Sequence, residues 1–114
     1  MKQTSRLKLG KITLVNLTSH PITIYSKHHT YKIEESLNSP IATYSQEDLP
    51  SIKDISITRK KVDRVVNMPK EKDNTYYIVS VVIASALPNR KDLLVPDSIK
   101  KGRQVFGCVG FFQL

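Results

Sequence analysis

The stretch that decides the fold is "YYIVSVVIASALPNRKDLLVPDS", residues 76–98. Twelve almost uninterrupted apolar positions precede a charged turn, and a second apolar run follows the turn. A helix that spans a bilayer needs about 20 apolar residues, so the first run is too short to cross a membrane. We therefore interpret the stretch as the core of a folded protein and expect no membrane partner.

The first apolar run changes its conformational preference halfway along. Residues 76–79 are strand formers, whereas the Ala-containing half that follows loses little entropy in a helix. Ser80 lies between the halves and can accept a backbone N–H as a helix N-cap, and Pro88 would end the helix. We predict a buried strand followed by one short helix near residues 80–87. A single long strand through Ala84 is the alternative.

The rest of the chain predicts short strands separated by polar turns, because Val, Ile and Thr dominate its apolar runs. The expected strands include 12–17, 22–25, 31–33, 41–44, 92–96 and 104–114. Residues 47–50 are expected to end a strand, and residues 98–103 to form a turn. The predicted fold class is α+β, a mostly antiparallel β-sheet of about six to eight short strands with one short helix near residues 80–87.

The domain organisation follows from length and composition. Residues 1–10 are polar and basic and end in Gly10, so we expect a flexible basic arm there. The remaining residues, 11–114, are enough for one hydrophobic core and not for two. We therefore expect a single globular domain after the arm.

The charge of the chain favours anionic partners. Its formal net charge is +8, which raises the local concentration of phosphates and acidic surfaces around it. In residues 51–70, Ile and Val alternate with Lys and Arg, which predicts half-buried strands with a basic outer face. Nucleic acid is therefore one candidate partner. Its candidate contact residues are Lys8, Lys11, Arg59, Lys60, Lys61 and Arg64.

Residues for catalysis or metal binding do not form a recognisable pattern. Cys108 is the only cysteine, which excludes an intrachain disulfide and indicates a reducing compartment. It stands in an apolar strand, where burial makes a thiol inert. His28 and His29 are adjacent and would point to opposite faces of a strand, and no nucleophile motif or phosphate-binding glycine motif occurs. We expect a non-enzymatic protein with no catalytic residues, no metal and no cofactor.

The candidate ligand-binding residues are polar positions set against rigid apolar elements. They are Asn16, Thr18, His20, Ser80, Arg90 and Asp92. The first three alternate along one strand end and would project to the same side. The amides after Ser80 would favour a negative group. Arg90 either pairs with Asp92 or holds a phosphate or carboxylate in its planar fork.

Three segments of the chain resemble a family of small uncharacterised proteins encoded by bacteriophages and prophages. The segments are "NLTSHPITIY" (16–25), "YIVSVVIASALPNRKDLLVPDS" (77–98) and "VFGCVGF" (105–111). The resemblance implies a phage or prophage origin but supplies no activity. The chain departs from the family pattern where "SIKDISITRKKVDRVV" (51–66) is more basic and where "KKGRQVFG" (100–107) replaces a more acidic turn.

These observations lead to one functional expectation with two alternatives. We expect a phage-encoded accessory binding protein in the host cytoplasm that sequesters a small anionic ligand, such as a nucleotide signal of host defence, or binds an acidic host protein. The alternatives are nucleic-acid binding through the basic face, and a minor structural or assembly protein of the virion. Homo-oligomers are compatible with each of these.

Overall fold

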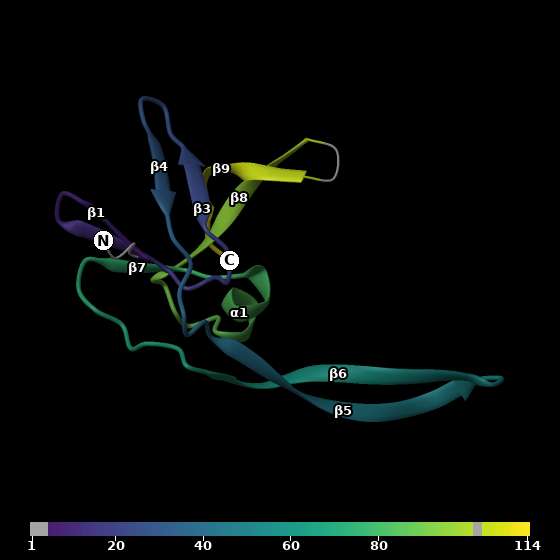
Figure 1. Ribbon diagram of the computed structural model, residues 1–114. Helices are drawn as coiled ribbons and strands as arrows, with labels where there is room; N and C mark the ends of the chain where they lie inside the picture. The colour runs from purple at the N-terminus through teal and green to yellow at the C-terminus, as the bar shows by residue number, and fades with distance from the viewer. Residues whose placement is uncertain (1–4, 102–103) are drawn as a thin grey trace.

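The computed structural model describes residues 5–101 and 104–114, which form nine strands and one helix (Figure 1). The elements are β1 (Arg6–Leu9), β2 (Ile12–Asn16), β3 (Ile22–Tyr25), β4 (Thr30–Ile33), β5 (Ile41–Ile52), β6 (Ile55–Val66), β7 (Thr75–Ile78), α1 (Val81–Ala86), β8 (Leu93–Lys101) and β9 (Gln104–Phe112). Seven strands form one sheet in the order β1-β2-β7-β8-β9-β3-β4, and β5 and β6 form a separate ribbon. The predicted β-rich fold with one short helix is confirmed. No helix in the described ranges is long and apolar enough to cross a membrane.

The quoted stretch forms the centre of the large sheet. β7 lies between β2 and β8 and runs parallel to both. Ser80 follows β7 as the N-cap of α1, and its hydroxyl oxygen accepts the Ile83 amide at 3.3 Å. Leu87 is the C-cap, directly before Pro88. The predicted strand, break and helix are confirmed, and the alternative of one long strand is wrong.

The large sheet is mixed, whereas the sequence predicts a mostly antiparallel one. The parallel pairs are β2 with β7, β7 with β8, and β3 with β9. The antiparallel pairs are β1 with β2, β3 with β4, and β8 with β9. The helix between β7 and β8 carries the chain back to the end of the sheet at which β7 begins. β8 can therefore run in the same direction as β7, as parallel neighbours require. β2 and β3 are joined by a short polar turn, yet they enter different parts of the sheet.

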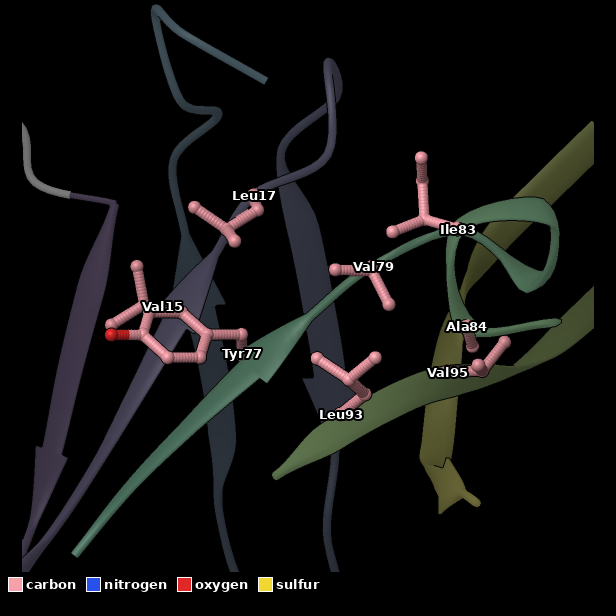
Figure 2. Close-up of a cluster of buried hydrophobic side chains, with 8 residues drawn as sticks. All are labelled: Val15, Leu17, Tyr77, Val79, Ile83, Ala84, Leu93 and Val95. Atoms are coloured by element: carbon pink, nitrogen blue, oxygen red, sulfur yellow. The ribbon is translucent and has the colours of Figure 1, made fainter. Parts of the chain in front are cut away.

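Apolar side chains are buried on both faces of the central strands. On one face, α1 packs on the cluster shown in Figure 2, which is formed by Val15, Leu17, Tyr77, Val79, Ile83, Ala84, Leu93 and Val95. On the other face lies a second cluster, formed by Leu14, Ile22, Ile24, Ile33, Ile78 and Cys108. Successive residues of β2 and β7 alternate between the two clusters, as pleated strands require. Burial on both faces explains why the quoted stretch begins with a nearly continuous apolar run.

Three element boundaries differ from the sequence prediction. Residues 6–9 form β1 instead of a flexible arm, because their backbone pairs with β2; residues 1–4 lie outside the described residues. Residues 47–50 continue β5 instead of ending a strand, because β6 pairs with β5 on both sides of this segment. Residues 98–101 extend β8 where the sequence predicts a turn, because β9 pairs with them; residues 102–103 lie outside the described residues.

The ribbon of β5 and β6, residues 41–66, extends away from the rest of the molecule (Figure 1), and we call it the hairpin arm. Each of its strands has 12 residues, and the principal axes of the molecule measure 57 × 36 × 28 Å. Ala42 and Val65 at its base pack against the cluster beneath α1. Beyond the base most of its side chains are exposed, so the prediction of half-buried strands does not hold along most of the arm.

Candidate ligand-binding site

A pocket of about 980 Å³ opens beside the first turn of α1. Residues directly after the carboxyl ends of β2 and β7 line one side, and residues of β3, β4, β8 and β9 complete the wall. Ligands of sheets with helical crossovers commonly bind at the carboxyl ends of the strands. The volume is at the upper end of the range typical of small-molecule sites.

The polar side chains of the pocket carry hydroxyl, imidazole or ammonium groups. They belong to Thr18, Ser19, His20, Thr23, Lys32, Ser39, Ser80 and Ser98. No carboxylate occurs among the described residues that line the pocket. Its apolar wall includes Val81 and Phe112, which are 49% and 41% exposed. The pocket therefore offers hydrogen-bond donors for an anion together with an apolar surface for a planar group.

Asn16 holds the polar edge of the pocket in place from beneath. It is fully buried, with 0% of its surface exposed. Its Nδ2 lies 2.9, 3.3 and 3.1 Å from the carbonyl oxygens of His20, Ile33 and Glu34. Its Oδ1 accepts the Thr18 amide at 2.9 Å and the Thr18 hydroxyl at 2.6 Å. Thr18 and His20 thus reach the pocket, as their alternation suggests, whereas Asn16 is the residue that positions them.

Ser80 lines the same pocket as Thr18 and His20, although it is far from them in sequence. Its hydroxyl oxygen accepts the Ile83 amide, so the hydroxyl hydrogen can donate to a ligand. α1 has only six residues, so its dipole adds little to the field in the pocket. The contribution of Ser80 is therefore its hydroxyl group.

Arg90 and Asp92 do not line this pocket; they lie in the turn between α1 and β8. The Nε and Nη2 of Arg90 donate to the two carboxylate oxygens of Asp92, both at 2.8 Å. Arg90 also lies 3.3 Å from Glu71 and 5.9 Å from the centre of the Tyr77 ring. The fork that could hold a phosphate is filled by the chain's own carboxylate. The group ties the turn to the loop before β7, and Arg90 borders a separate cavity of about 480 Å³.

The ion pair predicts a pH dependence of stability. The hydrogen bonds from Arg90 hold the pKa of Asp92 below its ordinary value, against the opposing effect of desolvation. A carboxyl with a lowered folded-state pKa stabilises the fold above its unfolded pKa, about 3.9, and that contribution is lost as the pH falls through the folded value. We expect Asp92→Asn to lower the free energy of unfolding by about 1 kcal/mol at neutral pH, because the ion pair is lost. The loss is no larger because the pair is partly exposed to solvent.

Urea unfolding at a series of pH values measures this effect. The difference between wild type and Asp92→Asn should shrink as the pH falls below about 4. Asp73→Asn, in the exposed loop before β7, is the matched control and should leave the free energy of unfolding unchanged at every pH. A difference for Asp92→Asn that stays constant down to the acid end would contradict the assignment.

The basic residues predicted to contact nucleic acid divide between two parts of the structure. Lys8 and Lys11 lie on β1 and in the turn after it, at one edge of the large sheet. The residues on β6, in the hairpin arm, are Arg59, Lys60, Lys61 and Arg64. Glu47 on β5 lies 3.7 Å from Arg59. The two groups of cations are therefore on separate sheets, and the group on the arm has acidic neighbours.

Sequence reasoning missed Lys32 and Phe112, which line the pocket from β4 and β9. Both come to the site because β3 lies between β4 and β9 in the sheet. Lys32 lies in a short strand, where a solvated lysine is common. Phe112 lies at the end of an apolar strand, where a core aromatic residue is common. Neither position carries a local signal, because only the strand order brings them to Ser80.

The structure places the potential metal ligands and the one thiol as follows. No group of three or more His, Cys, Asp or Glu side chains in the described ranges lies close enough to hold a metal ion. Cys108 borders the pocket but is buried, and burial raises the pKa of its thiol. A thiol in such surroundings is a poor nucleophile, and the predicted burial of Cys108 in an apolar strand is confirmed.

Comparisons of the chain with protein-family models, curated proteins and solved structures gave no match. Its function therefore has to be inferred from the pocket itself. The relevant properties are the volume, the hydroxyl groups, Lys32 and His20, and the apolar wall.

Proposed function

We propose that this protein binds a small anionic ligand with a planar apolar group, such as a nucleotide, and acts by sequestering it. With the phage or prophage origin that the resemblance implies, the ligand we propose is a nucleotide signal of host defence, held in the cytoplasm of the infected cell. One observation carries the proposal: a pocket of about 980 Å³ combines hydroxyls, an ammonium and an imidazole with an apolar wall and has no carboxylate among its described lining residues.

Lys32 is the residue best placed to recognise the negative charge. Its side chain is 64% exposed, and its ion pair with Glu34 is loose at 3.9 Å, so the ammonium is free to turn towards a ligand. The hydroxyls of Thr18 and Ser80 add neutral donors at the same pocket. Charge-assisted hydrogen bonds to phosphate are stronger than neutral ones, so we assign the largest share of anion recognition to Lys32.

The apolar wall suits the base of a nucleotide. Phe112 is partly exposed at the pocket, where its ring is open to stacking with a flat partner. Val81 and Pro96 add apolar surface around it. Stacking tolerates any base, so the ring would supply affinity, and the groups that contact the phosphates would supply selectivity for charge.

The residues that line the pocket together with His20 favour ligand binding without a chemical reaction. A catalytic imidazole is usually oriented by a carboxylate and paired with a nucleophile. Among the described lining residues there is no carboxylate, and the thiol of Cys108 is buried. We therefore propose capture rather than turnover.

A variant pair tests the role of Lys32. We expect Lys32→Ala to weaken ligand binding about tenfold, which corresponds to about 1.4 kcal/mol for one lost charge-assisted contact. Lys27→Ala removes the same charge from the exposed turn between β3 and β4, outside the pocket, and should leave the affinity within about twofold. A thermal-shift screen of mononucleotides, dinucleotides and cyclic nucleotides would identify the ligand, and titration calorimetry would give the affinities.

Two results would contradict the proposed function. Protein purified from its host should carry the ligand in native mass spectrometry, so a clean apo mass together with no thermal shift across the panel would refute it. Equal losses of affinity in Lys32→Ala and Lys27→Ala would mean that the net charge, and not the pocket, attracts the anion.

A further inference from the structure

Few other parts of the chain contact the hairpin arm. Among the described residues, β5 and β6 pair only with each other, and only the base of the arm packs on the large sheet's core. An isolated two-stranded ribbon is marginally stable in water because it buries too little apolar surface. A ribbon of this length, extended away from the rest of the molecule (Figure 1), therefore has the shape of a surface for a partner.

Apolar side chains are exposed at the far end of the arm. Ile52 and Ile55 pair across the strands beside the turn and are 64% and 60% exposed. Leu49 and Ile57 form the next apolar pair and are half-buried. A cluster of this kind, remote from the core, favours contact with another protein surface.

Charges are segregated between the two strands of the arm. The charged residues of β5 are Glu47 and Asp48, whereas those of β6 are Arg59, Lys60, Lys61, Asp63 and Arg64. The ion pair seen across the arm is the exposed contact of Glu47 with Arg59 at 3.7 Å. Lys60 and Lys61 lie opposite the uncharged Gln46 and Ser45, and Asp48 lies opposite Thr58. One strand of the arm is thus acidic and the other mostly basic.

We propose that the arm stacks face to face on the arm of a second copy of this chain, with β5 of each copy over β6 of the other. A two-fold axis makes this contact twice, so the acidic strand meets the basic strand on both sides. Glu47 then faces Arg59 and Lys61 of the second copy, because these side chains and the Leu49–Ile57 pair lie on one face of the arm, and the apolar ends are covered by protein. This interface is independent of the ligand pocket and of the proposed function.

The charge pattern favours a second copy over other partners. Nucleic acid would be attracted to β6 but repelled by Glu47 and Asp48 on the neighbouring strand. An acidic protein would meet the same repulsion. A second copy satisfies both strands at once, because it presents the acidic and the basic strand together.

Charge-reversed variants test the pairing. One variant is Glu47→Lys with Asp48→Lys, and the other is Lys60→Glu with Lys61→Glu. Light scattering coupled to size exclusion should find the wild type as a dimer. Each variant alone should raise the dissociation constant of the dimer at least about 100-fold, because like-charged strands then face each other. An equimolar mixture of the two variants should restore a dimer that contains one copy of each.

The controls separate this interface from misfolding and from other partners. Lys70→Glu with Lys72→Glu makes the same charge change in the exposed loop before β7 and should leave the dimer intact. Circular dichroism and thermal melts should show that all variants fold. A monomeric wild type, or a mixture that stays monomeric, would overturn the proposal. So would variants that keep the wild-type mass and lose only the retention of duplex DNA or RNA in a gel.

Discussion

Replacing Asn16 by Ala should destabilise the protein by about 3–5 kcal/mol, a large share of the 5–15 kcal/mol typical of a domain. Asn16 is fully buried, and its side chain bonds with the backbone of Thr18, His20, Ile33 and Glu34. Without it, several backbone groups beneath the pocket lose their partners, and each buried group left unsatisfied costs about 1–3 kcal/mol. The melting temperature should fall by on the order of 15 °C.

Two further substitutions identify hydrogen bonding as the cause. Asn16→Asp keeps the volume but turns the donor into an oxygen that faces three carbonyl groups. We expect it to be at least as destabilising as Asn16→Ala at neutral pH and partly relieved by acid, because the protonated carboxyl can donate again. Asn38→Ala, at an exposed position, should change the free energy of unfolding by less than about 0.5 kcal/mol. If urea unfolding finds Asn16→Ala as mild as Asn38→Ala, Asn16 does not organise the site.

The sequence predicts those features of the fold that depend on near neighbours. Ser80 is recognisable as a cap because the amide it accepts is only three residues away, at Ile83. Pro88 ends the helix through its own ring and needs no distant partner. The strands around this unit are recognisable from their composition, because β-branched and aromatic residues fit a pleated surface. Local chemistry is therefore sufficient to place the strand, the helix and the break.

Pairing partners could not be predicted in the same way. Nothing in the residues of β2 shows that it pairs with β7 rather than with β3, which follows it in the chain, since an apolar strand can pair with many others. The pocket depends on these pairings, because Lys32 and Phe112 reach it only through the order of β4, β3 and β9. Residues 47–50 look like a loop because their polarity and Pro50 are unusual in a strand, but an exposed ribbon tolerates both.

For the candidate site, the sequence predicts only which residues lie on the same side of a strand. Asn16, Thr18 and His20 alternate, which correctly groups them, but alternation does not reveal that the group begins in the core. Asn16 is buried and has a structural role, whereas Thr18 and His20 line the pocket. Arg90 and Asp92 were equally ambiguous, because their spacing permits both a ligand contact and the ion pair that the structure contains.

Gly107 is the glycine whose replacement should cost most among those described. Its φ is +154°, and an added Cβ would lie 2.6 Å from the Thr23 carbonyl oxygen and 2.8 Å from Cε2 of Tyr25. Thr23 and Tyr25 belong to β3, which pairs with β9 next to this glycine, at Ile24 and Cys108. We expect Gly107→Ala to push the two strands apart and to lower the free energy of unfolding by about 2–4 kcal/mol, through overpacking and the strained backbone.

Gly110 provides the matched control in the same strand. An added Cβ there would meet nothing within 4 Å, so Gly110→Ala should change the free energy of unfolding by less than about 0.5 kcal/mol. Gly107 also lines the pocket, beside Thr23. Gly107→Ala should therefore weaken ligand binding even at temperatures where the protein is folded, whereas Gly110→Ala should not. Equal denaturation midpoints for the two variants would contradict the close approach of β3 to β9, because that approach is what distinguishes the two glycines.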